Sequence, residues 1–203
     1  MRVARMLAAL LLGGMSGAVT GTMALAECPQ SLAPGVRLAF DDDSTALLRP
    51  AGAPGEVLEQ LRFDGGDDGY DLRSYHGLFD IESIEFESGR VIAEYSEKSQ
   101  YPGGPPAAPV EGMARVVVPV LVIATDERFE RQIIVTSGAL APTDLAGCSY
   151  MALPVTLEWV DPAESSVSYH LYLPQLGTAI LVGYEDAEGR DDYAVLGISV
   201  APD

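Results

Sequence analysis

Four aspartates lie close together in the run 64–71. They are separated by glycines, at positions Asp64, Asp67, Asp68 and Asp71. Carboxylate oxygens on a turn that glycine permits are the hard ligands that calcium prefers. The spacing departs from an EF-hand loop, because Gly66 occupies the third position, where an oxygen ligand is required. A calcium site is therefore one prediction, and a set of solvated hairpin turns is the other.

Two glutamates, Glu85 and Glu87, lie two residues apart in an alternating segment and would share one face of a strand. Their separation of roughly 6–7 Å, from a rise of about 3.3 Å per residue, could suit a glycosidase acid and base. The pair resembles a family of jelly-roll glycosidases with acidic residues at three alternate positions of one strand. Here Ser83 occupies the third position. The solvent face of a hairpin is the alternative interpretation.

The chain contains two histidines, His76 and His170. Neither has a second histidine or a cysteine at the spacing of zinc ligands. The chain after residue 26 has no Gly-x-Ser-x-Gly turn and no phosphate-binding glycine loop. We therefore predict a non-enzymatic protein without a cofactor, calcium excepted, with His76 in a turn and His170 on the surface of a sheet.

Three ring-bearing side chains, His170, Tyr172 and Tyr184, are candidates for a binding patch if they share one sheet face. Aromatic residues are enriched at the cores of protein interfaces. Ordinary cross-strand pairs are the alternative.

The two cysteines, Cys28 and Cys148, are too few for a disulfide-dense scaffold. No Cys-x-x-Cys motif is present, so a redox-active pair is not indicated. In an oxidising compartment two cysteines pair by default, which predicts a structural Cys28–Cys148 disulfide.

The first 26 residues have the pattern of a secretory signal peptide. Arg2 and Arg5 precede a short apolar stretch, and Ala24 and Ala26 are the small residues before a cut at Glu27. Residues 25–28, Leu-Ala-Glu-Cys, also resemble a bacterial lipoprotein box, except that Glu27 stands where a small residue is needed. We expect cleavage after Ala26 and a periplasmic or secreted bacterial protein, with lipidation of Cys28 as the alternative.

The charge of the chain limits its partners. Lys and Arg number 12 against 30 Asp and Glu, for a formal net charge of −18. Removal of a leader that carries two arginines would make it −20. Nucleic-acid binding depends on basic side chains that neutralise phosphates, so we predict none. After residue 26 no apolar run reaches the ~20 residues of a membrane span.

Alternation of apolar and polar residues with period two recurs along the chain and predicts strands. It is clearest in residues 151–159, 167–173 and 193–200. We expect an all-β protein, an antiparallel sandwich or barrel-like meander of about twelve short strands with little helix. Residues 54–61 fit a two-turn helix or a strand, and the neighbouring hairpins favour the strand.

The segment 101–109 holds four prolines and two glycines, so it cannot join a sheet. It separates a strand-rich part at 27–100 from another at 110–203. Because the predicted disulfide joins the two parts, we expect residues 27–203 to form one compact unit.

These residues identify no family, and we carry several functional hypotheses forward. The first is an exported accessory protein of the bacterial envelope that binds a partner with a basic surface, because a strongly acidic protein attracts cationic partners. The alternatives are a small β-barrel that binds an apolar ligand and a glycoside hydrolase that uses its carboxylates.

Overall fold

The computed structural model describes residues 27–64, 66–124, 127–160 and 165–202. These residues form strands and no helix. The strands are β1 (Val36–Phe40), β2 (Thr45–Pro50), β3 (Glu56–Arg62), β4 (Gly69–Tyr75), β5 (Phe79–Glu87), β6 (Arg90–Gln100), β7 (Val116–Ala124), β8 (Glu127–Ser137), β9 (Ala141–Leu145), β10 (Cys148–Val160), β11 (Ser166–Leu173), β12 (Thr178–Glu185), β13 (Arg190–Asp192) and β14 (Val195–Val200).

All the strands belong to one antiparallel sheet, as the alternation predicted. Its order is β13-β12-β11-β10-β8-β7-β6-β5-β4-β3-β2-β1-β14, and β9 pairs with the first half of β10. The sheet has fourteen strands rather than about twelve. Two of them, β9 and β13, have the sequences Ala-Pro-Thr-Asp-Leu and Arg-Asp-Asp, which lack the alternation that predicts a strand.

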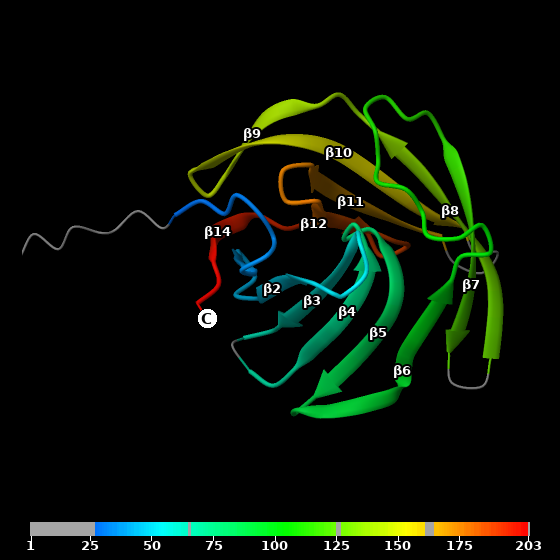
Figure 1. Cartoon of the computed structure of the whole chain (residues 1–203). Coiled ribbons are helices and arrows are strands. Elements are labelled where there is room, and N and C mark those ends of the chain that lie inside the picture. Colours follow the sequence, from blue (N-terminus) through cyan, green and yellow to red (C-terminus); the bar gives the residue numbers. More distant parts are fainter. Residues whose placement is uncertain (1–26, 65, 125–126, 161–164, 203) are drawn as a thin grey trace, which may run out of the picture.

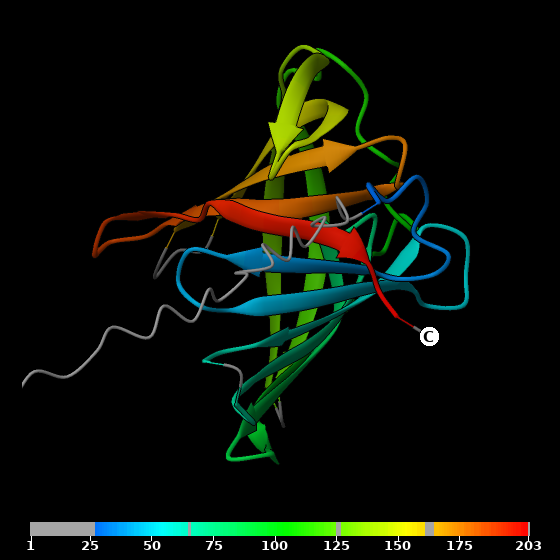
Figure 2. The same ribbon diagram turned by 90° about the vertical axis from the view of Figure 1, so that its left-hand side faces the viewer.

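The sheet curls so that β10–β12 face β2–β5 across an interior space (Figure 1). It is not closed. The two ends of the path nevertheless approach each other, since β12, β14 and β1 run side by side in Figure 2. The backbone N–H of Tyr193, just before β14, donates to the carbonyl of Val182 on β12 at 3.0 Å.

Two apolar clusters hold the curled sheet together. One packs β1, β2 and β3 against the β9–β10 hairpin and β12, and Val36, Leu38, Leu48 and Leu173 are at most 1% exposed there. The other packs β7, β8 and β10 against the start of β5. Full burial of a side chain of this size contributes on the order of 2 kcal/mol, so the clusters are the main source of stability.

The turn at His76-Gly77 joins the two facing walls of the sheet. Both residues have positive φ, as the turn prediction requires. The N–H of Ala179 at the start of β12 donates to the carbonyl of His76 at 2.8 Å. A Cβ atom on Gly77 would lie 2.7 Å from the Ala179 carbonyl oxygen, so only glycine allows this approach.

Two segments that the sequence singled out have clear places. Residues 54–61 lead into and form most of β3, as the neighbouring hairpins indicated. Residues 101–109 contain no strand, and the sheet continues across them because β6 pairs with β7. Tyr101, at the start of this segment, donates its hydroxyl to the Asp80 carbonyl at 2.8 Å. Within the described ranges no helix is long and apolar enough to span a bilayer.

Cys28 and Cys148 form a disulfide, with Cα atoms 5.6 Å apart and a sequence separation of 120. The bond attaches the segment before β1 to the first residue of β10. Near it, the Tyr150 hydroxyl donates to the Pro29 carbonyl at 3.0 Å. A sulfur in this bond cannot also carry a lipid thioether, so the disulfide and lipidation of Cys28 exclude each other.

Reduction of the disulfide should lower the free energy of unfolding by about 4 kcal/mol, because the bond closes a loop of about 120 residues in the unfolded chain. Urea unfolding with and without dithiothreitol measures the change. The double variant C28S/C148S should match the reduced protein and be insensitive to dithiothreitol. Equal unfolding midpoints for the oxidised and reduced protein would contradict the prediction.

Candidate functional site

The inward face of the sheet changes from apolar to polar between β2 and β6. The pairing register places one row of side chains across these strands, in the order Leu48, Glu59, Leu72, Ser83 and Glu97. Directly paired residues share a face of the sheet. Leu48 is fully buried in the first cluster, whereas Glu59, Ser83 and Glu97 contribute carboxyl and hydroxyl groups, with Leu72 as the one apolar residue among them.

Three strands supply the opposite wall. The register pairs Leu157 of β10 with Ser168 of β11, and Ser168 with Tyr184 of β12. His170 lies two residues beyond Ser168 on the same face and pairs with Leu181. A register shift between Tyr169 and His170 keeps Leu181 and Tyr184 on one face although they are three residues apart.

Between the two walls lies an interior cleft made of two adjoining chambers. The tyrosine chamber has a volume of about 240 Å³ and the histidine chamber about 530 Å³. Both are lined by the same four residues at their boundary, which are Glu59, Tyr70, Leu181 and Tyr184. Members of both apolar clusters contribute to its walls, Leu61 from the first and Leu157 from the second.

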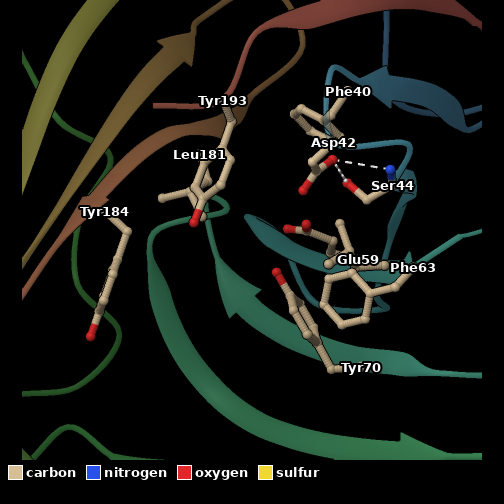
Figure 3. A pocket seen from close by; sticks show the side chains of 10 residues that line it. Phe40, Asp42, Ser44, Glu59, Phe63, Tyr70, Leu181, Tyr184 and Tyr193 are labelled. Atoms are coloured by element: carbon tan, nitrogen blue, oxygen red, sulfur yellow. Dashed lines mark hydrogen bonds between the residues drawn. The ribbon is translucent and has the colours of Figure 1, made fainter. Parts of the chain in front are cut away.

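The tyrosine chamber is lined by aromatic rings and two carboxyl groups. Figure 3 shows the oxygen atoms of Glu59, Tyr70 and Tyr193 directed toward the space between these side chains. One Asp42 oxygen accepts hydrogen bonds from Ser44, from its N–H at 3.0 Å and its hydroxyl at 2.6 Å. Among the described residues, the other Asp42 oxygen accepts no such bond. Asp42, Glu59 and the tyrosines all line the chamber, so carboxylate and phenol groups both face it.

Glu59 and Asp80 are half-buried carboxyl groups in the wall of the cleft. Burial raises the pKa of Glu59 from 4.5 to about 7, and the charge of Asp80 adds to the effect. Burial likewise raises the pKa of Asp80 from 3.8 to about 7, with Glu97 as the second cause. Within the described part of the chain, neither side chain has a hydrogen-bond or ion-pair partner that would offset the cost of burying its charge.

His170 is the one basic side chain that lines the cleft. Burial lowers the pKa of its imidazole from 6.5 to about 4, so the ring is neutral at pH 7. Its Nε2 lies 2.9 Å from the Ser168 hydroxyl. Its Nδ1 is buried and has no hydrogen-bond partner among the described residues. The prediction that His170 lies on the sheet surface was wrong, because the curl of the sheet encloses this face.

The arginine and lysine side chains on the neighbouring strands point to the outer face of the sheet. Arg62 pairs with Asp71 at 2.7 Å. On β4–β6, Glu82 pairs with Lys98 at 2.9 Å and with Arg73 at 3.7 Å. The lining of both chambers includes no lysine or arginine. The pleat therefore sends cations outward while carboxyl groups of the same strands face the cleft.

The three candidates for a binding patch do share one face, but that face is turned inward. His170 and Tyr184 line the cleft. Tyr172 is 7% exposed and packs edge-on against His76, with ring centroids 6.4 Å apart. These two rings line a separate depression of about 500 Å³ beside the loop between β2 and β3. Burial lowers the pKa of His76, and a hydrogen bond with the backbone of Pro106 partly opposes this.

The four aspartates of the run 64–71 do not converge on one point. Asp71 is paired with Arg62, and Asp68 accepts a hydrogen bond from the N–H of Ser88. Across the residues that the structure describes, no group of three or more His, Cys, Asp or Glu side chains is placed to hold a metal ion. Calcium binding at Asp64, Asp67, Asp68 and Asp71 stays a prediction.

The pair Glu85 and Glu87 is divided between two environments. Glu85 lines the histidine chamber, whereas Glu87 is exposed at the end of β5. The carboxyl groups that accompany Glu85 in this chamber are those of Glu59 and Asp80. Neither residue was a candidate site residue from the sequence. A signal for Glu59 was present, because it interrupts the apolar row of Val57 and Leu61 at the alternate position.

Comparisons with known proteins give little beyond this geometry. No protein-family model and no curated protein matches the chain. A solved structure of the hypothetical lipoprotein YmcC from Escherichia coli (K12) aligns with a TM-score of 0.44 and 9% sequence identity. The alignment covers 84% of this chain and 91% of that chain. A similarity at this level carries no inference about function.

The raised pKa of Glu59 predicts a pH-dependent cost to stability. The folded state holds a proton on Glu59 up to about pH 7, whereas the unfolded state releases it near pH 4.5. Stability should therefore be fully retained below pH 4.5, fall as the pH rises to 7 and then level off. Between pH 4.5 and pH 7, the free energy of unfolding of the wild type should fall by about 2–3 kcal/mol relative to that of E59Q.

Urea unfolding at half-unit steps from pH 4 to pH 8.5 measures this difference. The comparison with E59Q cancels the titration of groups that do not interact with Glu59, including His170, whose lowered pKa acts in the opposite direction. Asp80 interacts with Glu59, so its contribution is part of the measured difference. The variant E130Q, at an exposed position of β8, is the control and should follow the wild type at every pH. A constant gap between wild type and E59Q would contradict the prediction.

Proposed function

We propose that the protein is an exported binding protein that takes a small ligand into its interior cleft. The observation that carries this proposal is an interior cleft that side chains do not fill. Ligand sites have volumes of about 300–1,000 Å³ and a few polar groups that converge. The histidine chamber, at about 530 Å³, has this size, and its walls are more polar than is usual for such sites.

The lining supports a ligand with polar groups rather than a purely apolar one. Carboxyl groups of Glu59, Asp80 and Glu85 face the histidine chamber together with Trp159 and Tyr184. An apolar ligand would displace water from these carboxyl groups without replacing its hydrogen bonds, which is costly. The lining of the cleft therefore supports an apolar ligand less well than the sequence alone did.

The disulfide supports the location outside the cytoplasm, because such bonds persist in oxidising compartments. Cleavage after Ala26 concerns residues outside those the structure describes and stays a prediction. The same is true of a partner protein with a basic surface, for which the net charge of −18 is the motivation.

A second candidate function is hydrolysis of a glycosidic bond in the same cleft. The specific observation is that two carboxyl groups, Glu59 and Asp80, have pKa values of about 7, as a general acid requires. Glu85 shares their chamber. Loss of a measured glycosidase activity in E85Q would favour this candidate, whereas activity that E85Q retains would remove Glu85 from the mechanism.

A panel of small molecules tests the binding proposal. Organic cations, organic anions, neutral sugars and apolar compounds are added singly, and complexes are detected by native mass spectrometry and thermal melting. At least one class should bind the wild type and raise its melting temperature. The variant L181W should weaken this binding at least tenfold, because Leu181 lines both chambers and the larger ring would obstruct the boundary between them.

The control is L196W, which introduces the same ring on β14 at a side chain that is 66% exposed. It should bind ligand as the wild type does. Binding that L181W retains would place the ligand elsewhere on the protein, and the absence of any ligand in all four classes would contradict the proposal.

A further inference from the structure

Four carboxyl groups, from one turn and two strands, are distributed through the cleft rather than gathered at one point. Asp42 follows β1 and lines the tyrosine chamber. Glu59 of β3 lines both chambers. Asp80 and Glu85 of β5 line the histidine chamber. A ligand that contacts all of them must extend through both chambers.

Aromatic rings accompany these carboxyl groups in each chamber. Phe40, Phe63 and Tyr193 line the first, Trp159 lines the second, and Tyr70 and Tyr184 lie at the boundary. The face of an aromatic ring attracts an organic cation, and ammonium groups are bound by such rings in many proteins. Rings and carboxylates together therefore favour positively charged organic groups.

Among the described residues, no lysine or arginine lines the two chambers, and their one histidine is neutral at pH 7. The ion pairs of Arg62, Arg73 and Lys98 lie on the outer face of β3–β6. Glu59 and Asp80 are half-buried in the wall of the cleft and have no donor or counter-ion in the described part of the chain. Carboxylates with reduced access to water are ordinarily paired, so these two groups can accept a partner from a ligand.

We propose that the cleft binds an extended organic cation with two or more amino groups, a linear diamine or polyamine. Its ammonium groups supply the missing donors and positive charges for Glu59 and Asp80, and its methylene chain lies against the aromatic rings. A single metal ion is a poorer fit, since no three ligating side chains of the described part converge. This inference rests on the proposed function and names its ligand class.

Binding of such a cation is linked to proton release. The groups that face Glu59 and Asp80 are the carboxyls of Asp42, Glu85 and Glu97, the phenols of Tyr70, Tyr184 and Tyr193, and His170. In the empty cleft Glu59 and Asp80 hold protons up to about pH 7. An ammonium group replaces these protons, so affinity rises as the pH rises through 7.

Isothermal titration calorimetry with 1,5-diaminopentane and spermidine tests the inference, with 1,5-pentanediol as the neutral control. At pH 8 both amines should bind and the diol should not. Affinity should fall about tenfold between pH 8 and pH 6 for each carboxyl that must lose its proton. Titrations of the unmodified protein at pH 7 in phosphate and in MOPS should show the release of about one proton, because two carboxyl groups with pKa values near 7 are each half-protonated at this pH.

Variants identify the groups responsible. E59Q and D80N should each weaken diamine binding at least tenfold at pH 8 and reduce its pH dependence. E130Q removes the same charge at an exposed position and should change the affinity less than twofold. If E59Q does not fold, the proton release of the unmodified protein still decides the matter.

Three outcomes would overturn the inference. One is that the diol binds as tightly as the diamine, the second is diamine binding without proton release, and the third is diamine binding that E59Q and D80N leave unchanged. If the amines do not bind, whereas another class of the panel binds the wild type and not L181W, the proposed ligand class is wrong and the binding function stands. If no class binds, both proposals fail.

Discussion

A pleated sheet that curls far enough encloses its own inner face, and every side chain on that face must then be packed or left facing a cavity. In this protein the inner face is apolar over β1 and β2 and over parts of β7, β8 and β10, where two clusters pack tightly. Between them the face carries carboxyl groups, and there the packing stops. The existence of the cleft thus depends on which residues occupy the inward positions of β3–β6.

Glu59 and Asp80 show the cost of this arrangement. A half-buried carboxyl group without a partner among the described residues is less well hydrated than in bulk water, which favours its protonated form and raises its pKa. An apolar residue at either position would extend the neighbouring clusters and avoid the cost. Residues that lower stability in this way are expected at functional sites. Glu59 and Asp80 therefore mark the cleft as the candidate site.

The sequence predicted much of the sheet, because alternation and turn residues are local signals. Residues 54–61 lead into and form most of a strand of the hairpin series, and Cys28 forms a disulfide with Cys148. The alternate row 151–159 was only partly correct. Met151 is 43% exposed while Leu153 is buried, because β10 changes partners from β9 to β8 and β11 between them. A change of pairing partner depends on distant strands and leaves no periodic trace in the segment itself.

The site was harder to predict, because alternation assigns two faces to a strand without saying which one is enclosed. His170 and Tyr184 meet the condition set for a binding patch, since they share one face, but that face lines the cleft and not the outside of the sheet. The most direct test of the account is a carbon-13 NMR titration of the Glu59 and Asp80 carboxyl groups, assigned with E59Q and D80N. The account predicts midpoints near pH 7 for both groups in the ligand-free protein. Midpoints near pH 4 would contradict it, because the carboxyl groups would then be solvated or paired rather than held unpartnered in the cleft.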